Sequence, residues 1–164
     1  MPITEELRNS AEEAGVRLEI VGGIPVWEAL PVYRHQTIIF RIQTSIRRTR
    51  STGVSCECVH VADISIRFPD GSQKRPDIAI FCREPDEQDE EVRMVPEAVV
   101  EILSKGYEAK DLKIGVPFYL AQGVKDVITL DPYSLKVLHF RGTERFEFQT
   151  PVEIELECGC VCVV

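Results

Sequence analysis

Two short apolar segments each carry a carboxylate where a buried strand is expected. The first reads Arg75-Pro76-Asp77-Ile78-Ala79-Ile80-Phe81, and the second reads Val99-Val100-Glu101-Ile102-Leu103-Ser104. A buried carboxylate is costly unless a positive group or a metal ion pairs with it. If the two strands lie side by side, Asp77 and Glu101 predict a divalent-metal site. The alternative is an ion pair between strands, which we consider weaker because Arg75 alone offers too little positive charge for two acids.

The overall composition is ordinary for a globular protein. The chain has 164 residues, of which 44% are hydrophobic and 28% charged, and its formal net charge is −8. This size predicts a single domain over residues 1–164. No apolar run approaches the roughly 20 residues that span a membrane, and residues 1–13 are polar and acidic, so we expect a cytoplasmic protein. The negative charge argues against a wholly basic nucleic-acid-binding surface but leaves room for a local basic face.

The six cysteines occur in groups spaced by two. They are Cys56, Cys58, Cys82, Cys158, Cys160 and Cys162. Without a secretion signal a disulfide framework is not expected, and zinc motifs usually separate paired cysteines by at least two residues. Alternation along a strand would place each group on one face, so the spacing favours buried packing residues.

The order of predicted elements indicates a mixed α/β domain. Residues 3–14 are predicted to be a helix capped by Thr4, residues 17–28 a hairpin turning at Gly22-Gly23, and residues 33–50 a long helix. Strands are expected at 54–61, 62–68, 74–82, 97–103, 127–130, 135–141, 144–148 and 152–157. A further helix over 108–122 should be kinked near Gly115 and Pro117. The apolar tail Val161–Val164 should pack in the core or pair at a homodimer interface.

Several short motifs occur in a fixed order along the chain: Leu18–Gly23, His35, Pro76-Asp77, Glu101 with Ser104, Asp111, Tyr119, Gly123-Val124 and Leu130–Pro132. This ordered set resembles the PD-(D/E)XK nuclease superfamily and, more closely, the Uma-type putative restriction endonuclease family, over about residues 19–141. The resemblance implies a restriction-endonuclease-like mixed central sheet flanked by helices, with an N-terminal hairpin and a strand-rich C-terminus.

The resemblance also implies a chemistry and a set of site residues. Phosphodiester hydrolysis needs an activated water and a cation that neutralises the charge building on the phosphoryl oxygens, and Mg²⁺ or Mn²⁺ prefers oxygen ligands. The family's two metal-binding carboxylates map to Asp77 and Glu101, and the carbonyl of Ile102 is a third candidate ligand. Further site candidates at matching positions are Glu19, His35 and Asp111.

The sequence departs from the family pattern at the lysine. The parent superfamily places it two residues after the glutamate, where this chain has Leu103. The Uma-type family places it on the following helix, where this chain has Gly115. Lys105 and Lys110 are therefore the predicted substitutes, and helical geometry directs Lys113 away from Asp111.

Two functions remain open from the sequence. The first is a Mg²⁺-dependent DNA endonuclease, and the second is a degenerate nuclease fold that acts as a non-catalytic binding or assembly module. Arg34, Arg41 and Arg48, spaced by seven on the predicted helix, could contact phosphates, although solubility or a dimer interface explains them equally well. The resemblance suggests a homodimer. A protein that holds zinc through its cysteines is the weakest reading.

Overall fold

The computed structural model describes residues 4–50, 53 and 55–164 of the chain. Its helical elements are α1 (Glu5–Glu13), α2 (Tyr33–Ser45), α3 (Glu108–Lys110), a π-helical turn (Asp111–Gly115) and α4 (Val116–Ala121). Its strands are β1 (Val16–Val21), β2 (Ile24–Ala29), β3 (Arg47–Arg48), β4 (Val59–Ala62), β5 (Ile66–Arg67), β6 (Gln73–Lys74), β7 (Ile78–Phe81), β8 (Ala98–Ile102), β9 (Asp126–Leu130), β10 (Lys136–Arg141), β11 (Glu144–Gln149), β12 (Glu153–Glu155) and β13 (Cys160–Val163).

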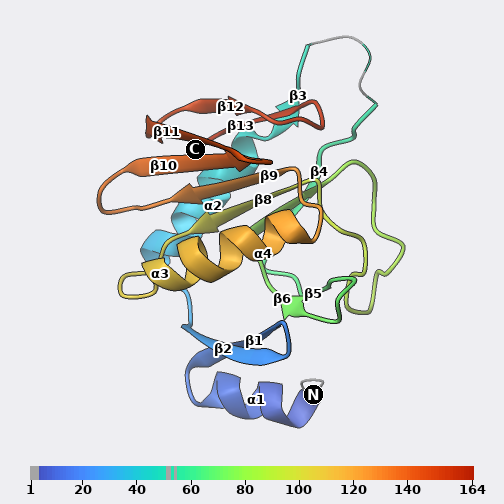
Figure 1. Ribbon diagram of the computed structural model, residues 1–164, viewed down its shortest axis with the longest axis vertical. Helices are drawn as coiled ribbons and strands as arrows, with labels where there is room; N and C mark the ends of the chain where they lie inside the picture. The colour runs from blue at the N-terminus through green and yellow to red at the C-terminus, as the bar shows by residue number, and fades with distance from the viewer. Residues whose placement is uncertain (1–3, 51–52, 54) are drawn as a thin grey trace.

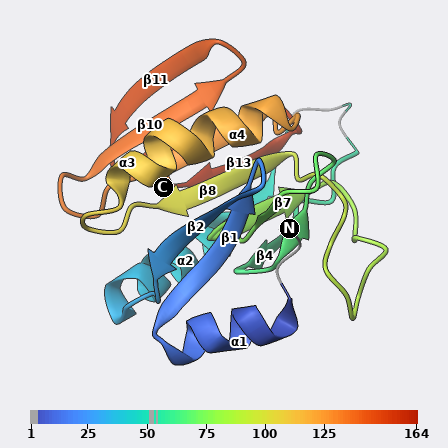
Figure 2. The ribbon, with the colours of Figure 1, turned by 60° about the horizontal axis from the view of Figure 1, so that its bottom comes forward.

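The strands form three sheets, which Figure 1 shows one above another. The central sheet has the order β11-β10-β9-β8-β7-β4, and only β8 and β9 in it run parallel. A smaller sheet, β2-β1-β6-β5, contains the N-terminal hairpin, and a third, β12-β13-β3, contains the C-terminus. Figure 2 shows α1 beside β1, against which its buried Ala11 packs. The predicted mixed α/β fold is confirmed.

The central sheet is covered on both faces, which explains the continuous apolar runs of its middle strands. Ile78 and Ile80 belong to a core shared with α2 and the C-terminal sheet. Ala79 and Phe81, which alternate with them along β7, belong to a core shared with α4. Figure 1 shows the two helices on opposite sides of this sheet. The sheet therefore fixes α2 and α4 on either side of the carboxylate-bearing strands.

Several predicted boundaries hold and others do not. Thr4 caps α1, since its Oγ1 accepts a hydrogen bond from Leu7 N at 3.2 Å, and the predicted hairpin is present. The long helix is shorter than predicted because it ends at Ser45, after which β3 pairs with β13. Arg48 is therefore on a strand rather than on the face of α2 that carries Arg34 and Arg41. Sheet pairing overrides helical periodicity here.

The helix predicted over residues 108–122 is interrupted near Gly115, as predicted, but by a π-helical turn at Asp111–Gly115. Pro117 lies in the first turn of α4 and has no N–H to donate back to the preceding turn, so the wider π spacing accommodates it. Gly115 at the end of this turn and Tyr119 in α4 are both buried.

The cysteines are buried in the core, with the exception of the half-buried Cys82. The expectation of a chain without disulfides is wrong in this structure, which contains Cys56–Cys82 and Cys58–Cys160 bonds; Cys158 and Cys162 are free. The apolar tail packs in the core, as predicted, since Val164 is buried and pairs with Val152. Among the described residues, no helix is long and apolar enough to cross a membrane.

Candidate active site

Asp77 and Glu101 meet where β7 begins and β8 ends. The antiparallel register pairs Ile78 with Val100, so the two acids lie beside each other on neighbouring strands. Asp77 N donates to Glu101 Oε2 at 3.2 Å, and Ile102 N donates to Asp77 Oδ2 at 2.7 Å. Both side chains are buried. The structure therefore brings the two carboxylates together, as predicted from their positions in apolar strands.

His35, in the first turn of α2, lies against both Asp77 and Ile102. Its Nε2 is 3.2 Å from Asp77 Oδ2 and 3.2 Å from the carbonyl oxygen of Ile102. Burial opposes protonation of this ring, but the hydrogen bond and the charge of Asp77 outweigh burial and raise the pKa of His35. Asp77 Oδ2 and the Ile102 carbonyl oxygen, two of the predicted metal ligands, therefore converge on the position of His35 Nε2. This position suits a positive charge.

Glu101 is held by Tyr119 from α4, whose hydroxyl donates to Glu101 Oε1 at 2.6 Å. Burial raises the pKa of Glu101 well above its ordinary value, and the charge of nearby Asp77 raises it further. Glu101 therefore keeps its proton to a higher pH than an exposed carboxyl group does.

Lys74, the last residue of β6, enters the same region from the smaller sheet. Its Nζ donates to Glu19 Oε2 at 2.9 Å and lies 5.2 Å from the centre of the Tyr119 ring. Burial opposes its charge, but Glu19 and Glu101 outweigh burial and raise the pKa of Lys74. A Cβ built on Gly115 would lie 3.9 Å from Lys74 Nζ. Lys74 thus places an ammonium beside the helix position where Gly115 has no side chain.

Lys110 occupies a neighbouring acidic pocket. Its Nζ lies 2.7 Å from Glu28 Oε2, 3.3 Å from Asp111 Oδ1 and 3.7 Å from Glu19 Oε2. Burial and the charge of Glu28 raise the pKa of Asp111 to about 6, although Lys110 opposes them. Glu19 and Asp111 therefore gather around Lys110, and all three are predicted site residues. Lys105 and Lys113 are exposed.

Arg17 on β1 adds positive charge next to Asp77. Its guanidinium is buried, 2.6 Å from Asp63 Oδ1 and 3.9 Å from Asp77 Oδ1. Arg75, which we expected to neighbour the two acids, instead pairs with Glu12 and Asp63. Lys74, Arg17 and His35 thus supply more positive charge than the sequence argument assumed. The case for a metal site therefore depends on the oxygen atoms of Asp77 and Ile102 that converge on one position.

Comparisons with known proteins identify the family of this chain and a structure of similar fold. A sequence model of the Uma2 family, described as putative restriction endonuclease, matches residues 4–158. The chain belongs to the Uma2 family. A crystal structure titled as a putative nuclease belonging to DUF820 from Anabaena variabilis is similar to it in fold, with a TM-score of 0.61 at 20% identity, over 94% of this chain and 83% of that one. A comparison with curated proteins finds no match.

Within this Uma2 chain, Lys74 is the site residue that sequence reasoning missed. It precedes Asp77 by three residues, but the chain turns between β6 and β7, so strand alternation does not carry from one to the other. Arg17 and Glu28 were also missed because their partners are distant in sequence. Strand alternation was the available signal for Arg17, because Arg17 and Glu19 are two residues apart on the predicted hairpin strand and so share one face.

The residues of the Uma2 site suit a divalent cation. Asp77, Glu101 and the Ile102 carbonyl offer oxygen atoms, the donor type that Mg²⁺ and Mn²⁺ prefer. His35 Nε2 already shows that Asp77 Oδ2 and the Ile102 oxygen converge on one cationic position. A cation there would also offset the two main effects that raise the pKa of Glu101, burial and the charge of Asp77.

We expect Glu19 to make the stability of this Uma2 protein depend on acid pH. Burial alone would raise its pKa, but Lys74 and Lys110 outweigh burial and lower the pKa of Glu19 to about 2, from 4.5. A lowered carboxylate pKa stabilises the fold above about pH 4.5, and this contribution is lost as the pH falls toward 2.

Urea unfolding of the wild type and of Glu19→Gln should reveal this effect. The difference in unfolding free energy between them should shrink by about 2 kcal/mol from about pH 6 to about pH 3. A difference that stays constant over this range would show that the ion pair of Glu19 with Lys74 does not lower the carboxyl pKa.

Proposed function

We propose that this protein is a metal-dependent endonuclease that hydrolyses phosphodiester bonds of DNA. The observation that supports it most is the meeting of Asp77 Oδ2 and the Ile102 carbonyl oxygen at a single cationic position, with buried Glu101 beside it. Family membership supports a nuclease, and metal and substrate are inferred from the donor atoms and from the resemblance.

Asp77, Glu101 and the carbonyl of Ile102 would hold the cation, Mg²⁺ or Mn²⁺. When bound, such an ion supplies positive charge to the phosphoryl oxygens and acidifies a water molecule. Tyr119 fixes the orientation of Glu101 through a 2.6 Å hydrogen bond, and Arg17 neutralises part of the charge of Asp77. His35 would leave the cation position while remaining close enough to bind water or phosphate.

Lys74 is the best-placed substitute for the lysine absent at Leu103 and Gly115. Its charge lowers the pKa of Glu101, and it lies beside the open position at Gly115. We therefore propose that Lys74, rather than the predicted Lys105 or Lys110, supplies the ammonium that stabilises developing charge. Lys110 would instead keep Glu28, Glu19 and Asp111 neutralised.

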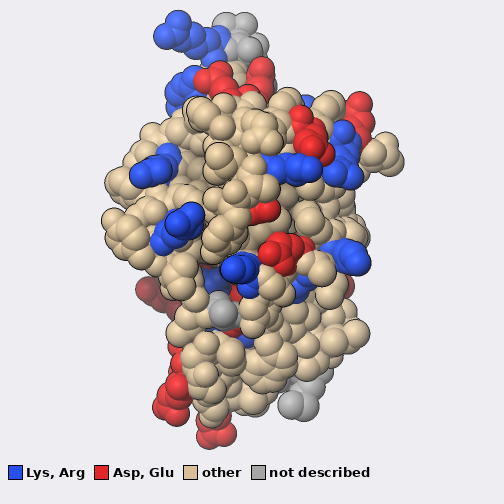
Figure 3. Space-filling model, turned by 90° about the vertical axis from the view of Figure 1, so that its left-hand side faces the viewer, with Lys and Arg blue, Asp and Glu red and all other residues tan. Residues whose placement is uncertain are grey.

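For contact with DNA, a groove along α2 is the candidate surface. Arg34 and Arg41 both line this groove, whose volume is about 690 Å³. Figure 3 shows basic and acidic side chains interspersed on the face that lies to the left in Figure 1, without a continuous basic surface. Such a surface favours a few phosphate contacts over strong nonspecific binding.

The alternative is a binding or assembly module without turnover, acting as a homodimer if the family tendency applies. This alternative is favoured by the ion pairs already present in the site. Lys74 pairs with Glu19, and Lys110 pairs with Glu19 and Glu28, so these charged groups are neutralised without substrate or metal. The two functions differ in turnover, so one assay separates them.

Nicking of supercoiled plasmid by purified protein tests the proposal. We expect Mg²⁺- or Mn²⁺-dependent nicking that EDTA stops and that Asp77→Asn abolishes. Asp63→Asn is a matched control, because Asp63 contacts the same Arg17 but lies outside the proposed ligand set. Metal binding without nicking by the wild type would support the non-catalytic module instead.

A further inference from the structure

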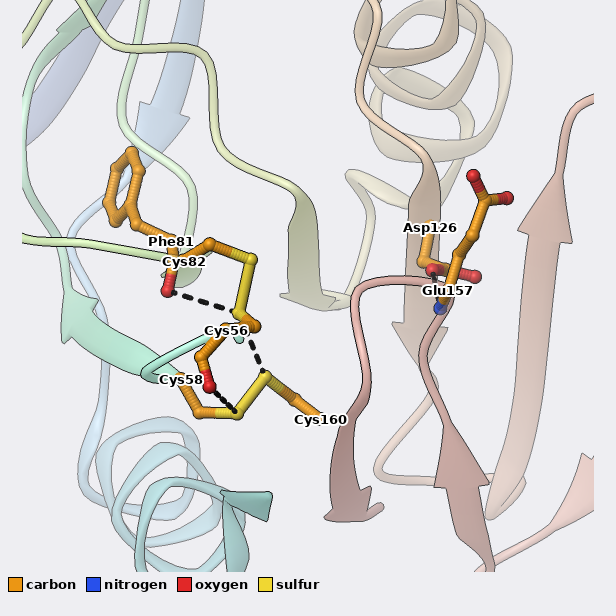
Figure 4. Close-up of a disulfide and its surroundings, with 7 residues drawn as sticks. All are labelled: Cys56, Cys58, Phe81, Cys82, Asp126, Glu157 and Cys160. Atoms are coloured by element: carbon orange, nitrogen blue, oxygen red, sulfur yellow. Dashed lines mark hydrogen bonds between the residues drawn. A yellow bond between two sulfur atoms is a disulfide. The ribbon is translucent and has the colours of Figure 1, made fainter. Parts of the chain in front are cut away.

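All six cysteines gather at the end of the sheet opposite to the proposed active site. Asp77 immediately precedes β7, whereas Cys82 immediately follows it. Figure 4 shows Cys56, Cys58, Cys82 and Cys160 brought together from separate parts of the chain, with the two disulfides side by side. This arrangement requires tertiary structure, since the segments are distant in sequence, and the proposed nuclease function makes no use of it.

The sulfur atoms are spaced like ligands of one metal ion. Cys56 Sγ is 3.5 Å from Cys160 Sγ, although no disulfide joins these two residues. The sulfurs of Cys56, Cys158 and Cys160 all lie within 4.8 Å of one another, the one such group of three among the His, Cys, Asp and Glu residues that the structure describes. Tetrahedral thiolates at a zinc–sulfur distance of about 2.3 Å are roughly 3.8 Å apart.

Local structure also positions the Cys158 sulfur as a metal ligand. It is free and buried, and Gly159, at φ +88°, makes the turn that places Cys158 next to Cys160. The backbone of Cys160 hydrogen-bonds to the Cys158 sulfur, which favours a thiolate, whereas burial raises the Cys158 pKa. A soft dication would compensate for that burial.

We propose that the reduced protein binds a zinc-class dication through Cys56, Cys158 and Cys160, with Cys58 or Cys82 as the fourth ligand. The disulfide form and the metal form exclude each other because Cys56 and Cys160 take part in both. Opening each disulfide consumes two electrons and two protons, which a dithiol supplies as it becomes a disulfide. Metal binding then releases one proton for each thiol that coordinates as thiolate. Spacing by two argued against a zinc motif within one segment, but here Cys56 comes from a part of the chain far from Cys158 and Cys160.

Titration with Zn²⁺ and with Co²⁺ tests this inference on the full chain. Protein reduced with a phosphine should bind one ion per chain, and the Co²⁺ form should show sulfur-to-metal charge-transfer absorption. Protein whose two disulfides are verified by mass spectrometry should bind no ion at these cysteines. Cys158→Ser should weaken binding more than about tenfold. Cys162→Ser, a change at a second free buried cysteine outside the group of three, should bind like the wild type.

The results separate the possible roles of the cluster. Comparing Cys58→Ser with Cys82→Ser identifies the fourth ligand. If reduced wild type binds no ion, or if binding does not depend on Cys158, the inference is wrong and the cysteines serve packing and cross-linking. If Cys158→Ser does not fold, the charge-transfer absorption of wild type still counts the thiolates, and its absence would refute the site. None of these outcomes depends on nuclease activity.

Discussion

Replacing Lys74 with methionine should lower plasmid nicking about a hundredfold, and a lysine introduced at Gly115 should restore much of it. Loss of one positioned electrostatic group commonly costs a factor of this size in rate. Rescue is feasible because a Cβ at Gly115 would meet only Lys74 Nζ at 3.9 Å and the Lys110 carbonyl at 3.8 Å, both ordinary contacts. With Lys74 shortened, a side chain from position 115 can enter the same space.

The matched control for this rescue is Gly115→Met in the Lys74→Met background. It adds similar volume without charge, so it should leave nicking low while Gly115→Lys restores it. Melting temperatures should accompany each variant, because Lys74→Met leaves buried Glu19 without its closest partner. Lys105→Ala and Lys113→Ala should change little, since both side chains are exposed. Equal nicking by wild type and Lys74→Met would exclude Lys74, and no nicking by wild type would instead refute the proposed function.

Glu101→Gln should stabilise the metal-free protein at neutral pH while removing most of its response to metal. Burial and the charge of Asp77 raise the pKa of the Glu101 carboxyl group in the folded protein. In the unfolded chain the same group loses its proton at about pH 4.5, so its contribution to stability falls as the pH rises above that value. Glutamine carries no charge and can still accept from Asp77 N and pair with the Tyr119 hydroxyl. The melting temperature of the variant should therefore exceed that of the wild type at neutral pH, and this advantage should shrink toward about pH 4.

Adding metal should give the wild type, rather than Glu101→Gln, the higher melting temperature. A ligand at a hundred times its dissociation constant stabilises a folded protein by about 2.7 kcal/mol, and the variant lacks one of the two carboxylates that would bind it. Thermal denaturation with and without Mn²⁺, together with calorimetric titration, measures both effects. If Glu101→Gln is less stable without metal, or binds Mn²⁺ like the wild type, Glu101 is a structural group rather than a ligand.

The part of the site that the sequence determined lies on single strands. Asp77 and Glu101 each interrupt an apolar run, and the cost of burying a carboxylate was sufficient to predict that they share one site. Thr4, the Gly22-Gly23 hairpin and the interruption near Gly115 were likewise predictable, because capping, turn geometry and the missing N–H of Pro117 act within a few residues.

Only the tertiary structure decided which distant groups meet these residues. Lys74 reaches the site because β6 pairs with β1 in one sheet while β7 pairs with β8 in another, and no periodicity spans the turn between them. The end of α2 depended on pairing between β3 and β13, and the cysteine cluster on three segments meeting in the core. Local sequence patterns report which face of an element is buried, whereas the partners on that face follow from strand register and packing between elements.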